Sequence, residues 1–208
     1  MQDRRPPALI LAGGLSRRMG RDKASTDLAG TAMIARIAER LMPQVLTLAI
    51  NAPDGFSLNL DLPLVPDTVP DRPGPLAGVL AGLRHAAITA PDTTHLLTVP
   101  ADTPFLPCNL ASELCAMADD PASIVLAASA GRIHPVVALW PLSLADDLQD
   151  WLAQPQNRRL QAYIARHPSI AVDFPLIETA IGELDPFFNV NTPDDLASAE
   201  RFLQVLPQ

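Results

Sequence analysis

The sequence predicts a three-layer α/β domain in which helices cover both faces of a mainly parallel, mixed sheet. Two observations predict this class. Short apolar stretches typical of buried strands alternate with helical stretches along the whole chain. The 208 residues include 48% hydrophobic residues, enough for one sizeable core. We therefore expect a single domain over residues 1–208.

The first half of the chain begins with a short buried strand at residues 8–11, which runs directly into two glycines. A helix is expected over 32–41, because its apolar residues have helical spacing and a proline follows at position 43. Two apolar runs that end in polar residues predict a strand at 45–50 and a weaker one at 62–65. After a loop rich in proline, small residues favour a close-packed helix over 76–87.

The second half continues the alternation. Strands are expected at 95–99, 124–128, 135–139, 170–174 and 187–190. Helices are expected at 109–117, 142–152 and 160–166. The turn at Ala130-Gly131-Arg132 predicts a hairpin, and Thr192-Pro193 has the cap and first-turn proline of a final helix.

The net charge of the chain argues against polyanionic partners. A net charge of -8 disfavours proteins that coat nucleic acid or an anionic membrane, so an anionic ligand must be bound locally. Arg17, Arg18, Arg21 and Lys23 cluster within seven positions, and Lys23 is the only lysine among 15 basic residues. A lone lysine indicates a site for a compact ammonium, although a solvated basic loop gives the same charge pattern.

Neither a signal peptide nor a stretch of about 20 apolar residues is recognisable, so we expect a cytoplasmic protein with no membrane span. The only two cysteines, Cys108 and Cys115, are too few for a disulfide framework or a four-ligand zinc site. Their spacing predicts two small buried residues on one helical face.

Polar residues follow several predicted strands at their carboxyl ends. Gly13, Gly14, Asn51, Asp67 and Asp102 all occupy such positions. Ligands of doubly wound sheets bind at this edge, so we expect these residues to gather there.

The first loop has the chemistry of a polyphosphate site. The backbone N–H groups of Gly13 and Gly14 can approach a phosphate, and the cations Arg18 and Lys23 can stabilise charge on a transferring phosphoryl group. The pattern is neither a P-loop nor a dinucleotide fingerprint, so an ordinary tight turn remains an alternative. Ser16 lacks a nucleophile-elbow context and is expected to hydrogen-bond backbone or phosphate.

Asp102 is the candidate metal ligand, because Mg²⁺ takes one or two carboxylates together with phosphate oxygens and water. A turn or helix-capping aspartate is the alternative. Asp67 has the chemistry to accept a ring N–H pair or a ribose hydroxyl, and Asn51 to bind a base or sugar edge. His134 has the chemistry to contact a phosphate or the backbone at a strand start.

The first loop resembles the signature of the molybdenum cofactor guanylyltransferases, the MobA family. Its matching positions are Leu11, Ala12, Gly13, Gly14, Ser16, Arg18, Met19, Gly20, Asp22 and Lys23. Further similar segments follow in order along nearly the whole chain, at residues 51–52, 65–67, 73–78, 100–105, 134–135 and 189–196.

This resemblance implies a Rossmann-like nucleotidyltransferase fold that transfers GMP from GTP to the terminal phosphate of Mo-molybdopterin and releases pyrophosphate. It implies that the first loop, Lys23, Asn51 and Asp67 bind GTP and that Asp102 binds Mg²⁺. Residues 1–105 are then mainly the GTP half and 106–208 mainly the molybdopterin half. By the same analogy His134, Asn189 and Asn191 lie on the pterin side.

Three alternatives stay open at this point. The related cytidylyltransferases share much of the first loop but tend toward Leu-Ala-Ala-Gly, where this chain has Leu-Ala-Gly-Gly. The sugar-phosphate enzymes usually have a glycine and a leucine where Ser16 and Met19 stand. A non-catalytic nucleotide-binding protein is the alternative of another class. Molybdenum-insertion proteins, chaperones and apo-molybdoenzymes are the implied protein partners.

Overall fold

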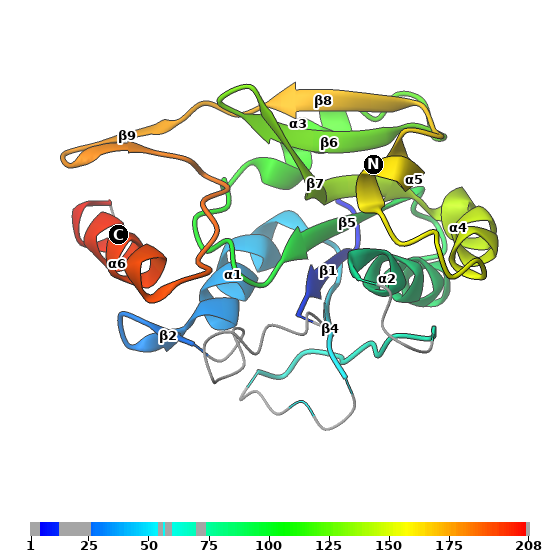
Figure 1. Ribbon diagram of the computed structural model, residues 1–208, viewed down its shortest axis with the longest axis horizontal. Helices are drawn as coiled ribbons and strands as arrows, with labels where there is room; N and C mark the ends of the chain where they lie inside the picture. Colours follow the sequence, from blue (N-terminus) through cyan, green and yellow to red (C-terminus); the bar gives the residue numbers. More distant parts are fainter. Residues whose placement is uncertain (1–4, 13–25, 54–55, 57–59, 70–73, 207–208) are drawn as a thin grey trace.

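The computed structural model describes residues 5–12, 26–53, 56, 60–69 and 74–206. Its centre is a six-stranded sheet in the order β4-β1-β5-β7-β6-β8 (Figure 1). The strands are β1 (Ala8–Leu11), β4 (Leu48–Asn51), β5 (His95–Pro100), β6 (Ile124–Ser129), β7 (Arg132–Pro141) and β8 (Ser169–Asp173). Only β7 runs antiparallel to its neighbours, so the predicted mainly parallel, mixed sheet is confirmed.

Helices cover both faces of the sheet, as the alternation of elements predicted. One face packs against α1 (Met33–Leu41), α3 (Leu110–Ala116) and α6 (Pro193–Val205). The other packs against α2 (Pro75–Thr89), α4 (Ala145–Leu152) and α5 (Leu160–Ile164). Successive residues of a strand point to opposite faces, so Ile10 belongs to the first core and Leu9 to the second.

Helix α2 lies unusually close to the sheet because two of its residues have no side chain. A Cβ atom at Gly82 would fall 2.6 Å from Leu9 Cδ2 and 2.7 Å from Leu96 Cδ2. The helix begins with Pro75 at its first turn, after Gly74 at a φ of 81°. The small residues of this segment therefore fix the distance between α2 and the strands β1 and β5.

The predicted hairpin joins β6 to β7. Ser129 pairs with Arg132, so the loop consists of Ala130 and Gly131 alone, and both have a positive φ, of 48° and 74°. Two such residues form the turn whose twist matches that of the flanking strands. Because β7 also runs antiparallel to β5, the start of β7 lies at the edge where β5 and β6 end.

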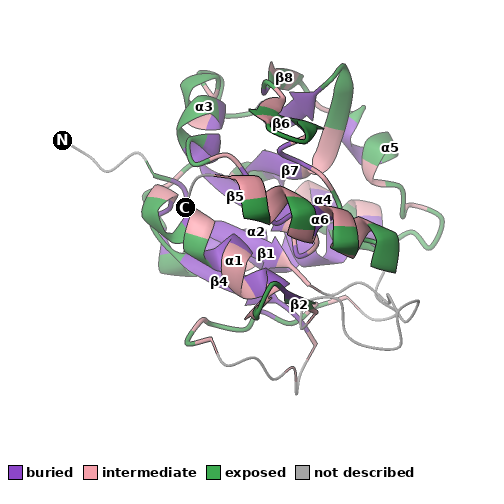
Figure 2. Cartoon of the chain, turned by 90° about the vertical axis from the view of Figure 1, so that its left-hand side faces the viewer, coloured by how far each residue is buried: buried purple, intermediate pink, exposed green. Residues whose placement is uncertain are grey.

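Helix α6 begins with the expected threonine cap. The Thr192 side chain accepts a hydrogen bond from the Asp195 N–H, and the Asp195 carboxylate accepts one from the Thr192 N–H. Only Ala199 of this helix is fully buried, and Figure 2 shows α6 lying on the outside of the molecule. Within the described ranges no helix has both the length and the apolar character needed to cross a membrane.

Two predicted strands were wrong and two small hairpins were missed. Residues 187–190 form no strand; Phe187 and Val190 are buried in the core, which explains their apolar pattern. Residues 62–65 contribute only a single bridge, between Leu64 and Ile50. The missed hairpins are β2 (Asp27–Leu28) with β3 (Thr31–Ala32) and β9 (Ile177–Thr179) with β10 (Gly182–Leu184). Such short strands leave almost no periodic signal.

The remaining predicted elements agree with the structure to within a few residues. The strand expected at 45–50 begins later, at Leu48, and the helix expected at 142–152 starts with a 3₁₀ turn, η4 (Leu142–Leu144). A second 3₁₀ turn, η3 (Met42–Gln44), follows α1 at the proline predicted to end it.

Candidate functional site at the carboxyl edge of the sheet

The carboxyl ends of β4, β1 and β5 lie side by side and form what we call the carboxyl edge. The Ala12 N–H donates to the Asn51 carbonyl at 2.9 Å, and the Ala101 N–H donates to the Leu11 carbonyl at 3.1 Å. The predicted binding residues Leu11 and Ala12 therefore lie between Asn51 and the segment that leads to Asp102. Asn51 and the segment that leads to Asp102 thus meet at one edge, as the sequence predicted, whereas Gly13 and Gly14 lie outside the described residues.

Asn51 and Asp67 are in direct contact at this edge. Asn51 Nδ2 donates to Asp67 Oδ1 at 2.8 Å and to the Val65 carbonyl at 2.9 Å, so both amide hydrogens are used. The side chain is buried, with only 3% of Asn51 exposed. Asn51 therefore holds the Asp67 carboxylate and the 64–67 segment in place.

Gly78 of helix α2 makes room for the Asn51 side chain. A Cβ atom at position 78 would lie 2.9 Å from Asn51 Cγ and 2.7 Å from Leu11 Cδ2. A side chain at position 78 would press on the buried amide of Asn51, and we expect it to displace the Asn51–Asp67 pair.

Asp102 follows β5 in a turn that is tied to the loop before α6. Its carbonyl accepts a hydrogen bond from the Val190 N–H at 2.8 Å, and its Oδ1 atom is buried. The neighbouring Thr103 is buried and donates from Oγ1 to Asn189 Oδ1 at 2.7 Å. These bonds bring Asn189 next to Asp102, although the two residues are far apart in the sequence.

Asn191 contacts the cap of helix α6. It is exposed, and its backbone N–H donates to Asp195 Oδ2 at 3.0 Å, beside the bond that caps α6. The described contact of Asn191 is therefore part of the helix cap that the sequence predicted at Thr192-Pro193.

The carboxylate at Asp102 fits a magnesium ion better than a transition metal. Among the described residues, no group of three or more His, Cys, Asp or Glu side chains is close enough to hold a metal. A single buried carboxylate oxygen at the carboxyl edge suits Mg²⁺, which takes its other ligands from phosphates and water.

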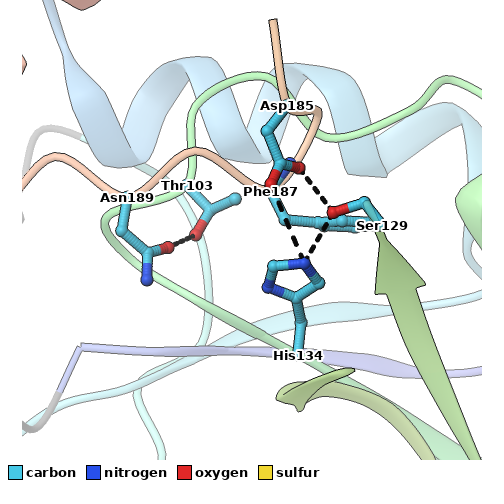
Figure 3. A network of polar contacts seen from close by, with 6 residues as sticks. All are labelled: Thr103, Ser129, His134, Asp185, Phe187 and Asn189. Carbon is cyan, nitrogen blue, oxygen red and sulfur yellow. Dashed lines mark hydrogen bonds and ion pairs between the residues drawn. The ribbon is translucent and has the colours of Figure 1, made fainter. Parts of the chain in front are cut away.

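His134 belongs to a polar cluster with Ser129 and Asp185 (Figure 3). Its Nε2 atom lies 2.7 Å from Ser129 Oγ and 4.0 Å from Asp185 Oδ2. Ser129 Oγ donates to Asp185 Oδ1 at 2.7 Å, and the Phe187 N–H donates to the same oxygen at 2.8 Å. Burial lowers the pKa of His134 below its usual value, against the opposing effect of the Asp185 charge.

Sequence reasoning missed Ser129, Asp185, Phe187 and the contact made by Thr103. Ser129 is the last residue of β6, so the rule that polar residues at strand ends face the ligand could have found it. Asp185 follows a short strand that left no recognisable pattern, and its position next to Ser129 depends on the long-range fold.

Five of the predicted site residues lie outside the described residues, so their positions are not part of the geometry above. They are Gly13, Gly14, Ser16, Arg18 and Lys23. Their segment leaves the sheet at Ala12, directly beside Asn51.

The cysteines are both free thiols. Cys108 is exposed and precedes α3, so the expectation that it is a buried helical residue was wrong; Cys115 is half-buried.

The three layers, a mainly parallel sheet between two layers of helices, and the polar residues at its carboxyl edge define a doubly wound α/β protein, the class that binds ligands at this edge. The model of the MobA-like NTP transferase domain matches residues 8–181. The molybdenum cofactor guanylyltransferase of Rhizobium meliloti is 52% identical over 204 residues, which cover 97% of this chain and 93% of that protein. The chain therefore belongs to the MobA-like NTP transferase family, whose members include the molybdenum cofactor guanylyltransferases.

Other known proteins agree with this. The molybdenum cofactor guanylyltransferase of Sinorhizobium fredii is 50% identical and is covered over 94% of its length, with 97% of this chain matched. The crystal structure of molybdopterin-guanine dinucleotide biosynthesis protein A from Archaeoglobus fulgidus has a TM-score of 0.71 at 23% identity, covering 95% of this chain and 98% of that one. At 23% identity, the likeness to the Archaeoglobus fulgidus structure shows a shared fold alone.

Proposed function

We propose that this nucleotidyltransferase transfers GMP from GTP to the terminal phosphate of Mo-molybdopterin. An oxygen of that phosphate forms a bond to the α-phosphorus of GTP, while the bond from that phosphorus to the bridging oxygen breaks and pyrophosphate leaves. Two relatives that are 52% and 50% identical to this chain are named molybdenum cofactor guanylyltransferase, and these names support the reaction. The observation that carries the proposal is the contact between Asn51 and Asp67 beside Ala12.

Asp67 is proposed to bind guanine. Asn51 orients its carboxylate through Oδ1, and a carboxylate accepts hydrogen bonds only. Guanine presents two adjacent N–H donors on one edge, whereas cytosine pairs one donor group with a ring acceptor. The acidic partner at this position therefore favours GTP over CTP, in agreement with the names of the relatives.

The first loop is proposed to hold the triphosphate. Gly13, Gly14 and Ser16 would supply backbone and hydroxyl donors, with Leu11 and Ala12 at the start of the loop. Arg18 and Lys23 would stabilise the charge that develops on the transferring phosphoryl group and on pyrophosphate. These roles rest on the sequence signature.

Asp102 is proposed to hold Mg²⁺ together with phosphate oxygens. When bound there, the ion would neutralise charge on the triphosphate. The protein's own contribution is to fix the carboxylate: the Val190 N–H holds the Asp102 backbone, and the buried Oδ1 atom restricts the side chain.

The second substrate is proposed to bind on the side of His134, Asn189 and Asn191. Residues 1–105 would then serve mainly GTP and residues 106–208 mainly molybdopterin, within one domain. We also propose that the enzyme works in the cytoplasm, where its two free thiols stay reduced, and that it passes its product to molybdenum-insertion proteins, chaperones or apo-molybdoenzymes.

An assay with α-labelled GTP, Mo-molybdopterin and Mg²⁺ tests the reaction. The expected result is a labelled pterin dinucleotide and one pyrophosphate per product, with GTP preferred in a panel that includes CTP and ATP. Preference for CTP would replace the guanylyl assignment by a cytidylyl one. If the protein binds nucleotide but forms no product, it is a non-catalytic nucleotide-binding protein. The same assay without Mg²⁺ and with a chelator tests whether the reaction requires the metal, and we expect no product.

A further inference from the structure

The hydroxyl of Ser129 determines which ring nitrogen of His134 carries a proton. Ser129 Oγ donates its only hydrogen to Asp185 Oδ1 at 2.7 Å. It is therefore an acceptor toward His134 Nε2, which lies 2.7 Å away. The Nε2 atom must carry a hydrogen to make this bond, and a neutral imidazole then has an acceptor at Nδ1.

The environment keeps this imidazole neutral and in one orientation. The side chain of His134 is only 11% exposed, and its ring packs against Phe187 with 4.6 Å between ring centroids. The charged groups that face it are Asp185, which raises its pKa, and Arg132, which lowers it, while burial has the largest effect and lowers it. The ring has little freedom to rotate or to ionise at neutral pH.

The Nδ1 atom faces the candidate site. Figure 3 shows this second ring nitrogen on the side of the ring toward Thr103 and Asn189, opposite to Ser129 and Asp185. Among the described residues no hydrogen bond to Nδ1 is found, whereas Nε2 is engaged by Ser129. Asn189 uses its oxygen on Thr103, so its amide N–H groups are the donors that remain for a ligand.

We infer that Ser129 and Asp185 are positioning residues that present His134 Nδ1 as a hydrogen-bond acceptor to an N–H or O–H group of the second substrate. A neutral acceptor repels phosphate oxygens, so His134 does not contact the triphosphate. The inference rests on the proposed function, because it assigns this face to the substrate that receives GMP. Neither Ser129 nor Asp185 touches the reacting atoms in this account.

Paired serine variants test the inference. Ser129→Ala removes the acceptor that fixes Nε2–H and is expected to raise KM for Mo-molybdopterin about 10-fold, with KM for GTP and kcat within about 2-fold of wild type. Ser123→Ala is the matched control: Ser123 flanks the other end of β6, is also buried and also donates to an aspartate, Asp120. It is expected to leave both KM values unchanged.

Asp185→Asn separates charge from hydrogen bonding. An amide oxygen in place of Oδ1 still accepts from Ser129 and from the Phe187 N–H, so only the charge is lost. In wild type, KM for Mo-molybdopterin is expected to rise as pH falls through the lowered pKa of His134, because protonation converts Nδ1 into a donor. In the variant this rise is expected at a lower pH, since the carboxylate that raised the pKa of His134 is gone.

The outcomes are distinguishable. Wild-type protein that makes no dinucleotide refutes the proposed function and this inference with it. Wild-type turnover combined with an unchanged KM for Mo-molybdopterin in Ser129→Ala, or with an equal rise in both KM values, refutes the inference alone. If Ser129→Ala does not fold, the pH dependence of Asp185→Asn tests the inference. A rise in KM for Mo-molybdopterin at the same pH as in wild type would overturn it.

Discussion

Strand β6 has a cluster of serine, histidine and aspartate at each of its ends, and the two clusters differ in what they leave for a ligand. At the carboxyl end, Ser129 donates to Asp185 and only Nε2 of His134 is engaged. At the amino end, Ser123 donates to Asp120 at 2.9 Å. There His95 Nδ1 lies 2.8 Å from Thr94 Oγ1, and Nε2 lies 3.4 Å from the Ser123 carbonyl.

The comparison teaches that residue types alone do not make a site. Burial lowers the pKa of both histidines, so both rings are neutral near pH 7. His95 Nε2 links the start of β5 to the Ser123 carbonyl before β6, and Nδ1 contacts the adjacent Thr94, so both ring nitrogens have structural partners. His134 keeps one nitrogen directed toward Asn189, at the edge where ligands of such sheets bind. Substitutions at the carboxyl edge should therefore change kinetic constants, whereas substitutions at the amino end should change the free energy of unfolding.

The largest effect is expected at Asp102 of the carboxyl edge, and Asp120, at the amino end of β6, serves as its comparison. Asp102→Asn should lower kcat by roughly 1,000-fold, because it weakens the proposed Mg²⁺ site and the charge balance around the phosphates. Asp120→Asn, at the amino end, should leave kcat within about 2-fold of wild type. Steady-state assays measure both. Equal losses in the two variants would remove the functional distinction between the ends.

Lys23→Ala should lower kcat by about 100-fold, through loss of the cation that we propose to stabilise charge on the departing pyrophosphate. Lys23→Arg keeps the charge but replaces a compact ammonium by a broad fork, and it should recover only part of the activity. Arg84→Ala, which removes a surface ion pair with Asp146, is the charge-matched control and should keep full turnover. Full activity in Lys23→Arg would show that the single lysine is a coincidence of composition.

Gly78→Ala should raise KM for GTP about 10-fold, because the added methyl group displaces Asn51 and with it Asp67. Gly82→Ala provides the comparison on the same helix, since its methyl group meets only the core residues Leu9 and Leu96. It should lower the free energy of unfolding by about 1–3 kcal/mol without changing KM. Kinetics and urea unfolding separate the two effects, and an unchanged KM in Gly78→Ala would contradict the role given to Asn51.

The smallest effect on catalysis is expected at the amino end. His95→Gln should lower the free energy of unfolding by about 1–2 kcal/mol at pH 8 and leave both KM values unchanged. Because folding lowers the pKa of His95, the unfolded chain binds the proton first, and stability falls as pH drops through about 6.5. The variant should lose less stability than wild type between pH 7 and pH 5. A steeper loss in the variant would mean that His95 is not buried as a neutral ring.

The sequence predicted the sheet, the helices on both faces and the gathering of Asn51 and Asp67, because these follow from local periodicity and from the strand-end rule. It missed Asp185 and gave residues 187–190 as a strand. The partners of those residues, Ser129 and Asp102, are distant in sequence, and such contacts leave no local pattern. Asn51 was expected to bind a base or sugar edge, but its amide hydrogens go to Val65 and Asp67.

A ¹⁵N NMR titration of the ring nitrogens of the four histidines tests the central claim most directly, because it observes both ends of β6 in the wild-type protein. Mo-molybdopterin should move the Nδ1 resonance of His134 and leave His95 unchanged, whereas GTP with Mg²⁺ should move neither ring strongly. An Nδ1 signal of His134 that shows a bound proton in the free protein, or an equal response of His95 to the second substrate, would contradict the account.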